Sequence, residues 1–128
     1  MTLDPANGLV NIVAIQSAAS ADAGTAAPGF DFTTGVSFAV TPKSGVGPFY
    51  VTPEETFAPT AKATVGGYGA WFLNLAPGTY EATATASSMT CSGVPGSGYG
   101  WPGDAGVSKF PILADFDTQT VLFFCAPK

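Results

Sequence analysis

The chain has 128 residues and a net charge of −5, with four lysines, no arginine and no histidine. Nucleic-acid binding needs clustered cations and the chain has none, so we expect no nucleic-acid partner. No apolar run approaches the roughly 20 residues that span a membrane, and histidine, the commonest general base and metal ligand, is absent, so we expect no membrane span, metal site, cofactor or enzyme activity.

The N-terminal part of the chain predicts one strand followed by a linker. Residues 9–15 are rich in β-formers and follow the turn dipeptide Asn7-Gly8, so residues 1–16 are expected to hold the first strand. Residues 17–29 read SAASADAGTAAPG and have no apolar period, which is typical of a flexible linker with a reach of about 20 Å. Residues 30–128 then form the body of a single domain that spans residues 1–128.

Short strands follow along the body of the chain. Val36, Phe38 and Val40 alternate with polar or small residues and predict a half-buried strand that ends at Pro42. Residues 49–51 and 61–65 predict two more strands. Between them, the segment 54–57 is flanked by prolines and predicts a turn.

The stretch from Gly69 to Tyr80 predicts a strand, a tight turn and a second strand. Trp71, Leu73 and Leu75 are spaced to share one face, which we expect to lie in the core. Pro77-Gly78 has the residue types of a turn, and the strand over residues 79–86 would complete a hairpin. From this pattern we expect four residues to be largely buried: Phe38, Leu73, Tyr80 and Phe123.

The C-terminal third predicts a loop and a final pair of strands. Residues 92–106 are rich in glycine and proline and predict a loop. Residues 107–113 and 118–125 predict the last two strands. Seven to eight short strands without a convincing helical period indicate an all-β chain folded as an antiparallel β-sandwich.

The pattern GxWFxNLxPGxY at positions 69 to 80 resembles the most recognisable segment of the carboxypeptidase regulatory-like domains. These are transthyretin-like (prealbumin-like) β-sandwiches that occur as accessory modules in secreted proteins. The resemblance covers roughly residues 35–127 and implies an Ig-like or prealbumin-like sandwich. The sequence departs from that pattern at its start, where a strand plus a long linker replaces the usual Gly-x-Val strand and short polar turn.

Cys91 and Cys125 are the only cysteines, so either they form one disulfide or they are two buried free thiols. Only 10% of the residues are charged, against about 25% in an ordinary domain, and serine, threonine and glycine are abundant. This composition favours an extracellular or cell-surface location and therefore the disulfide. The chain-entropy relation gives such a bridge roughly 4 kcal/mol of stabilisation.

Two strands are apolar on both faces, whereas a strand with one face in water should alternate. In the first strand, Leu9, Val13 and Ile15 lie opposite Val10 and Ile12 in the alternation, and in the last, Leu122 and Phe124 lie opposite Val121, Phe123 and Cys125. Something must cover the second face. Either the first strand pairs within its own chain, or it adds to the sheet of a neighbouring copy.

These features support two functional hypotheses. The first is a non-catalytic extracellular structural or assembly module, a surface or filament subunit that self-associates by strand addition and apolar contacts. Its expected assembly residues are Leu9, Val10, Ile12, Val13, Ile15, Leu122 and Phe124. The second is a carbohydrate-binding accessory module, in which Tyr99 and Trp101 of the glycine-rich loop stack on a polysaccharide instead of packing over the end of the sandwich. Asp104, Asp115 and Asp117 are better interpreted as solvated turn residues than as a calcium site.

Overall fold

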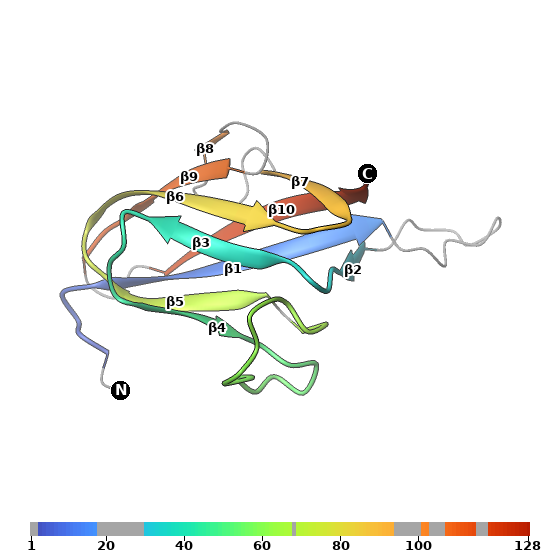
Figure 1. Ribbon diagram of the computed structural model, residues 1–128. Coiled ribbons are helices and arrows are strands. Elements are labelled where there is room, and N and C mark those ends of the chain that lie inside the picture. Colours follow the sequence, from blue (N-terminus) through green and yellow to red (C-terminus); the bar gives the residue numbers. More distant parts are fainter. Residues whose placement is uncertain (1–2, 18–29, 68, 94–100, 103–106, 115–117) are drawn as a thin grey trace.

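The computed structural model describes residues 3–17, 30–67, 69–93, 101–102, 107–114 and 118–128 (Figure 1). These residues form an all-β structure of two packed sheets, as the sequence predicts. Eight strands have five or more residues, which matches the expected number, and two further strands are shorter. In chain order, the strands are β1 (Gly8–Ser17), β2 (Phe30–Phe32), β3 (Ser37–Thr41), β4 (Val46–Tyr50), β5 (Ala70–Leu75), β6 (Gly78–Thr85), β7 (Met89–Gly93), β8 (Trp101–Pro102), β9 (Val107–Ile112) and β10 (Thr118–Pro127).

The two sheets differ in size and in pairing. Sheet A has the strand order β4-β5-β1-β10-β7, with β2 paired to β1 beside β5, and sheet B has the order β3-β6-β9-β8. Every strand pair is antiparallel except β1 and β10, which run parallel from the pair Leu9 and Thr118 to the pair Ile15 and Phe124. Figure 1 shows these two long strands side by side, with β3 and β6 of sheet B in the other layer.

The first strand pairs within its own chain. β1 lies in the interior of sheet A, with β5 on one edge and β10 on the other. Of the two arrangements left open by the sequence, the structure therefore has the one in which β1 completes its own sheet. The predicted linker over residues 17–29 lies, apart from the end of β1, outside the described residues.

The core between the sheets consists of the inward residues of both. Val36, just before β3, and Phe38 and Val40 on it are buried, while Ala39 and Thr41 are exposed, which confirms the predicted alternation. Phe38, Leu73, Tyr80 and Phe123 are all buried, as expected. The largest fully buried apolar side chains include Tyr50, Phe110, Phe123, Ile12, Leu75 and Ile112.

The predicted hairpin after Gly69 is wrong. β5 belongs to sheet A and β6 to sheet B, so the turn around Pro77 carries the chain from one layer to the other. The Tyr80 hydroxyl donates a hydrogen bond back to the carbonyl oxygen of Ala76 (2.5 Å), which ties the start of β6 to this crossing. The last two strands cross between layers in the same way, because β9 lies in sheet B and β10 in sheet A.

The predicted faces of β5 are also wrong, because the strand contains a bulge. Asn74 adopts a φ of 57°, and the register shifts so that one step of two residues on β1 matches three on β5. Phe72 and Leu75 consequently both point into the core, whereas Trp71 is half-buried outside it. The structure therefore contradicts the expectation that Trp71, Leu73 and Leu75 share a core face.

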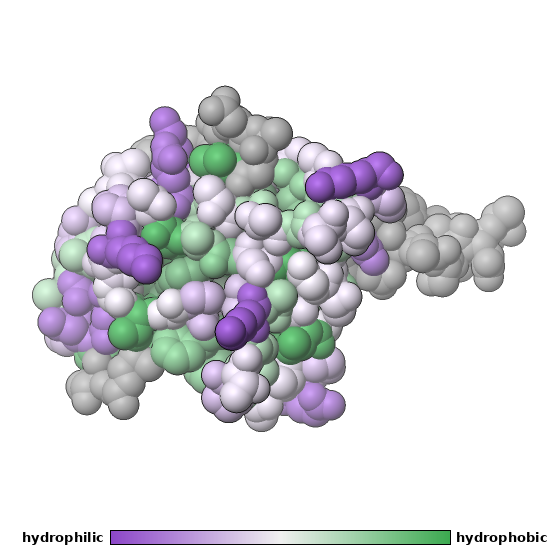
Figure 2. All heavy atoms as spheres, viewed as in Figure 1, coloured by the Kyte–Doolittle hydropathy of each residue, from purple (hydrophilic) through white to green (hydrophobic). Residues whose placement is uncertain are grey.

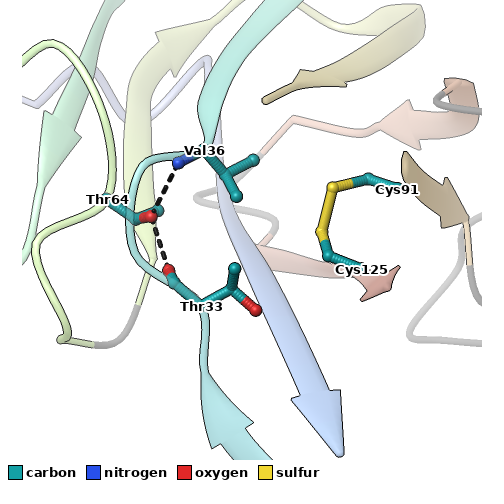
Figure 3. Close-up of a disulfide and its surroundings, with 5 residues drawn as sticks. All are labelled: Thr33, Val36, Thr64, Cys91 and Cys125. Atoms are coloured by element: carbon teal, nitrogen blue, oxygen red, sulfur yellow. Dashed lines mark hydrogen bonds between the residues drawn. A yellow bond between two sulfur atoms is a disulfide. The ribbon is translucent and has the colours of Figure 1, made fainter. Parts of the chain in front are cut away.

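The predicted strand over residues 61–65 does not form. This segment instead caps the start of β3 through Thr64, whose hydroxyl accepts a hydrogen bond from the Val36 amide (3.1 Å) and donates one to the Thr33 carbonyl (Figure 3). The Thr64 amide also donates to the Val36 carbonyl oxygen (2.8 Å). The segment 54–57 is a turn, as predicted, in which Glu55 has a φ of 64°.

The disulfide between Cys91 and Cys125 is confirmed (Figure 3). Cys91 lies on β7, a strand that the sequence pattern does not predict, directly opposite Cys125 on β10. Both cysteines are buried members of the core. The bridge therefore fixes the edge strand β7 to the strand beside it and closes a loop with a sequence separation of 34.

One buried hydroxyl joins the two sheets. The Tyr50 hydroxyl, on the edge strand of sheet A, accepts a hydrogen bond from the backbone amide of Phe38 on the edge strand of sheet B (3.0 Å). Burial raises the pKa of the Tyr50 phenol, while the bond from Phe38 and a side-chain bond with Ser37 oppose that rise.

Candidate functional site

The candidate site is the face of sheet A that points away from the core. Along β1, Val10, Ile12 and Ala14 belong to the core, so Leu9, Val13 and Ile15 alternate onto the opposite face. β10 behaves in the same way. We call this surface the outer apolar face and define it by eleven residues: Leu9, Val13, Ile15, Phe32, Val46, Phe49, Phe57, Trp71, Leu73, Leu122 and Phe124.

The strand register brings these side chains together in rows. Phe32, Ile15 and Phe124 are neighbours across β2, β1 and β10. Val13 lies beside Leu122 in the adjacent row. We define the β2–β10 row as Phe32, Ile15 and Phe124 together with Leu122 from the adjacent row. Phe32 is exposed and the other three side chains are half-buried.

A hollow lies at the other end of the same face. Leu3, Leu9, Phe57, Trp71 and Leu73 line an open space of about 420 Å³. The Phe57 ring is half-exposed and packs on Phe49 with 5.5 Å between ring centroids. Phe49 is the register partner of Trp71, so the turn at residues 54–57 supplies one wall of the hollow and β5 supplies the floor.

No charged residue occurs on β4, β5, β1, β10 or β7. Two polar residues are register partners at the centre of the face, Asn11 on β1 and Thr120 on β10. Asn11 is buried, and its amide nitrogen donates to the carbonyl oxygen of Ala70 (3.1 Å). On the side of the molecule seen in Figure 2, hydrophilic residues stand apart from one another among weakly polar ones. The charges of the chain thus lie off the strands of this sheet, apart from Asp31 on β2.

The structure divides the predicted assembly residues into two groups. Leu9, Ile15, Leu122 and Phe124 lie half-buried on the outer apolar face, where part of each side chain is available for contact. Val13 alternates onto the same face but is buried, which is a correction of its predicted role. Val10 and Ile12 lie in the core with no exposed surface, which is a correction of their predicted role.

Six residues of the face and its hollow do not follow from the sequence pattern, and two of them, Phe32 and Val46, lie in strand segments that the pattern does not mark. Leu3 and Phe57 lie outside strands, so no periodicity marks them, and the apolar spacing places Trp71 and Leu73 in the core. A bulge signal at Asn74, a residue type that tolerates positive φ, would have moved both onto the outer face.

The predicted ligand-binding residues are not brought together by the described structure. Tyr99 lies outside the described residues. Trp101 is on β8 in register with Lys109, and its side chain is likewise outside the description. The carbohydrate-binding role stays a prediction, which loss of glycan-array binding in a folded Trp101→Ala variant would support.

Other chemistry finds no support in the described part of the chain. Among those residues, no group of three or more acidic, histidine or cysteine side chains is placed to hold a metal ion, and no helix is long and apolar enough to span a membrane. Asp104, Asp115 and Asp117 lie outside the described residues. Glu54 and Glu55 are exposed on their turn.

Comparisons of the chain with models of protein families, with curated proteins and with solved structures give no match. The resemblance to carboxypeptidase regulatory-like domains therefore stays a prediction. Any function must be argued from the outer apolar face itself.

Proposed function

We propose that this chain is a non-catalytic structural module of an extracellular surface or filament, and that it associates with other copies through the outer apolar face. The observation that carries the proposal is the concentration of exposed apolar side chains on a sheet whose five main strands carry no charge. Among the described residues, six large hydrophobic side chains are exposed, and four of them lie on this face or line its hollow: Leu3, Phe32, Val46 and Phe57.

Burial of apolar area supplies the energy for such a contact. Burying apolar surface contributes about 25 cal/mol per Å², so a face of several hundred Å² gives a contact several kcal/mol of driving force before the costs of association. Monomeric proteins rarely expose a contiguous apolar patch larger than a few hundred Å², and patches above this size mark interaction sites. The face therefore fits a contact surface better than a solvated one.

Two further features support an extracellular setting. The disulfide joins buried cysteines on neighbouring strands, and disulfides persist mainly in oxidising compartments. The scarcity of charge is compensated by threonine and serine on exposed strand positions such as Thr41, Thr79 and Thr85. Both features suit a structural protein outside the cytoplasm.

The mode of association in this proposal is face contact. Strand addition through β1 would require β1 to leave the interior of its sheet, where it pairs with β5 and β10 over most of its length. Contact through the outer apolar face requires no rearrangement of either copy. The face therefore supplies the contact at a lower energetic cost.

Analytical ultracentrifugation across a concentration series tests the proposal. We expect the weight-average mass of the intact, oxidised chain to rise with concentration above that of one copy. A strictly monomeric chain at its highest soluble concentration would overturn the proposed function.

A further inference from the structure

The outer apolar face has two regions of complementary character. One is the β2–β10 row of large apolar side chains, centred where β1 ends. The other is the hollow of about 420 Å³ lined by Leu3, Leu9, Phe57, Trp71 and Leu73, centred where β1 begins. Phe32 is exposed and the other three side chains of the row are half-buried, so the row presents apolar surface at the opposite end of the face from the hollow.

We propose that the partner of this face is a second copy of the same chain, packed face to face about a two-fold axis in the contact plane. This inference rests on the proposed function and names the partner and geometry of the contact. An axis midway between the two regions places the row of each copy on the hollow of the other. Such a contact uses the same patch on both copies and closes as a pair.

Charge favours an identical partner. No charge is present on β4, β5, β1, β10 or β7, so two copies bring these strands together without desolvating an ion. The nearest acidic residues in the chain flank the face: Asp4 follows Leu3, Asp31 precedes Phe32, and Glu54 and Glu55 lie on the turn that walls the hollow. The net charge of −5 makes two copies repel at long range. A cationic partner would meet acidic residues only at the margin of the face, because the five main strands offer no charge to position it.

The area of the face is close to that of a stable pair. Five strands at about 4.8 Å spacing give a width of roughly 24 Å, and the ten-residue strands β1 and β10 extend about 33 Å. Allowing for the shorter strands β4, β5 and β7, the face covers roughly 570 Å², part of it polar at Thr120 on β10 and on β7. A standard specific interface buries about 800 Å² on each partner. The face is close to the roughly 600 Å² that each partner buries in the smallest standard interfaces.

Paired variants test this geometry on the intact, oxidised chain by sedimentation equilibrium. Phe57→Asp places a charge in the hollow, and Phe32→Asp places one in the row; both residues are exposed, so folding should be preserved. Leu113→Asp is the matched control, since Leu113 is more exposed and follows β9 of sheet B. We expect each face variant to raise the dimer dissociation constant at least about tenfold, and the control to change it less than about twofold.

Mixing the two face variants tests the two-fold arrangement. In a mixed pair, the copy with Phe57→Asp contributes an intact row and the copy with Phe32→Asp contributes an intact hollow, so one of the two row-on-hollow contacts is unchanged. The mixture should therefore associate more tightly than either variant alone. Higher salt should strengthen association of the wild-type chain, because it screens the repulsion between acidic copies.

The outcomes separate the two proposals. If both face variants self-associate as tightly as the wild-type chain, the paired-face inference is overturned and the contact must lie outside this face, while a wild-type mass that rises with concentration still supports a self-associating structural module. The paired-face inference alone is also overturned if the mixture shows no recovery, or if salt weakens association. A monomeric wild-type chain overturns both.

Discussion

The outer faces of the two sheets differ although both sheets contribute to one core. Sheet B alternates between buried and exposed residues, and its outer face carries polar side chains such as Thr83 and an ion pair between Lys109 and Glu81 (3.7 Å). The main strands of sheet A are apolar on both faces along β1 and β10. The outer face of sheet B is polar and is well solvated, whereas the outer face of sheet A exposes apolar side chains to water.

The difference between the sheets shows how the apolar pattern of a strand reflects the surroundings of its two faces. Alternation on β3 reports one core contact and one solvated face, whereas the run from Val121 to Cys125 on β10 reports two apolar environments. The core accounts for Val121, Phe123 and Cys125, which are buried, and leaves Leu122 and Phe124 half-buried. The second environment is what the proposed contact supplies.

Substitutions at two neighbouring residues of β10 test whether its core face and its outer face differ in their contribution to stability. Phe123→Ala removes a fully buried ring from the core and should lower the free energy of unfolding by about 3 to 5 kcal/mol. Phe124→Ala truncates a half-buried ring on the outer apolar face and should cost about 1 kcal/mol or less, because part of its area is already in water. Urea denaturation at a concentration where the chain is monomeric measures both.

The two variants should differ in the opposite order in their effect on self-association. Phe124→Ala should weaken self-association, and Phe123→Ala, while folded, should not. Equal losses of stability in the two variants would mean that the outer face of sheet A is covered within the chain, and the difference between the two sheets would disappear.

The alternating parts of the fold can be predicted from the sequence, because periodicity reports them directly. The strands around Phe38, Tyr80 and Phe110 and the β-sandwich class follow from apolar spacing alone. The disulfide follows from the cysteine count and the composition. The edge strand β7 does not, because the sequence MTCSG has little apolar signal, and its place depends on the bond to Cys125.

The layer crossing and the site are harder to predict. A turn at Pro77-Gly78 is compatible with a hairpin and with a crossing, and the choice depends on contacts made by the whole strand. The left-handed conformation of Asn74 reassigns Trp71 to the outer face, and the sequence marks that shift only by one asparagine, a residue type that tolerates positive φ without requiring it. The hollow has no periodic signature because Leu3 and Phe57 reach it from irregular segments.

A second prediction sharpens the comparison at the point where the two sheets are tied together. Tyr50→Phe removes the acceptor for the buried Phe38 amide, and an unmet buried donor costs about 1 to 3 kcal/mol. Because burial raises the pKa of Tyr50, the folded state keeps its proton at a pH where the unfolded chain loses it. The stability of the wild-type chain should therefore fall as the pH rises above about 10, the ordinary tyrosine value.

Denaturation of both proteins between neutral pH and about pH 11 measures the two effects, since this range brackets the ordinary tyrosine pKa. The Tyr50→Phe variant should start less stable and lose less stability with rising pH than the wild type. Parallel pH profiles for the two proteins would show that the Tyr50 hydroxyl does not couple folding to alkaline pH.

The smallest expected effect concerns the ion pair on sheet B. Lys109 and Glu81 are register partners on β9 and β6, and about half of each side chain is in water (50% and 47% exposed). Solvent screens such a pair, so a double-mutant cycle with Lys109→Ala and Glu81→Ala should give a coupling energy of about 0.2 to 1 kcal/mol.

This coupling should shrink in about 1 M salt, where the screening length is only about 3 Å, while the concentration dependence of self-association stays unchanged in all three variants. A solvated face can lose its charges at little cost, in contrast to the outer apolar face, where adding one charge is expected to prevent pairing. A coupling well above about 1 kcal/mol, or weaker association in these variants, would show that sheet B is also a contact surface and would remove the distinction between the two faces.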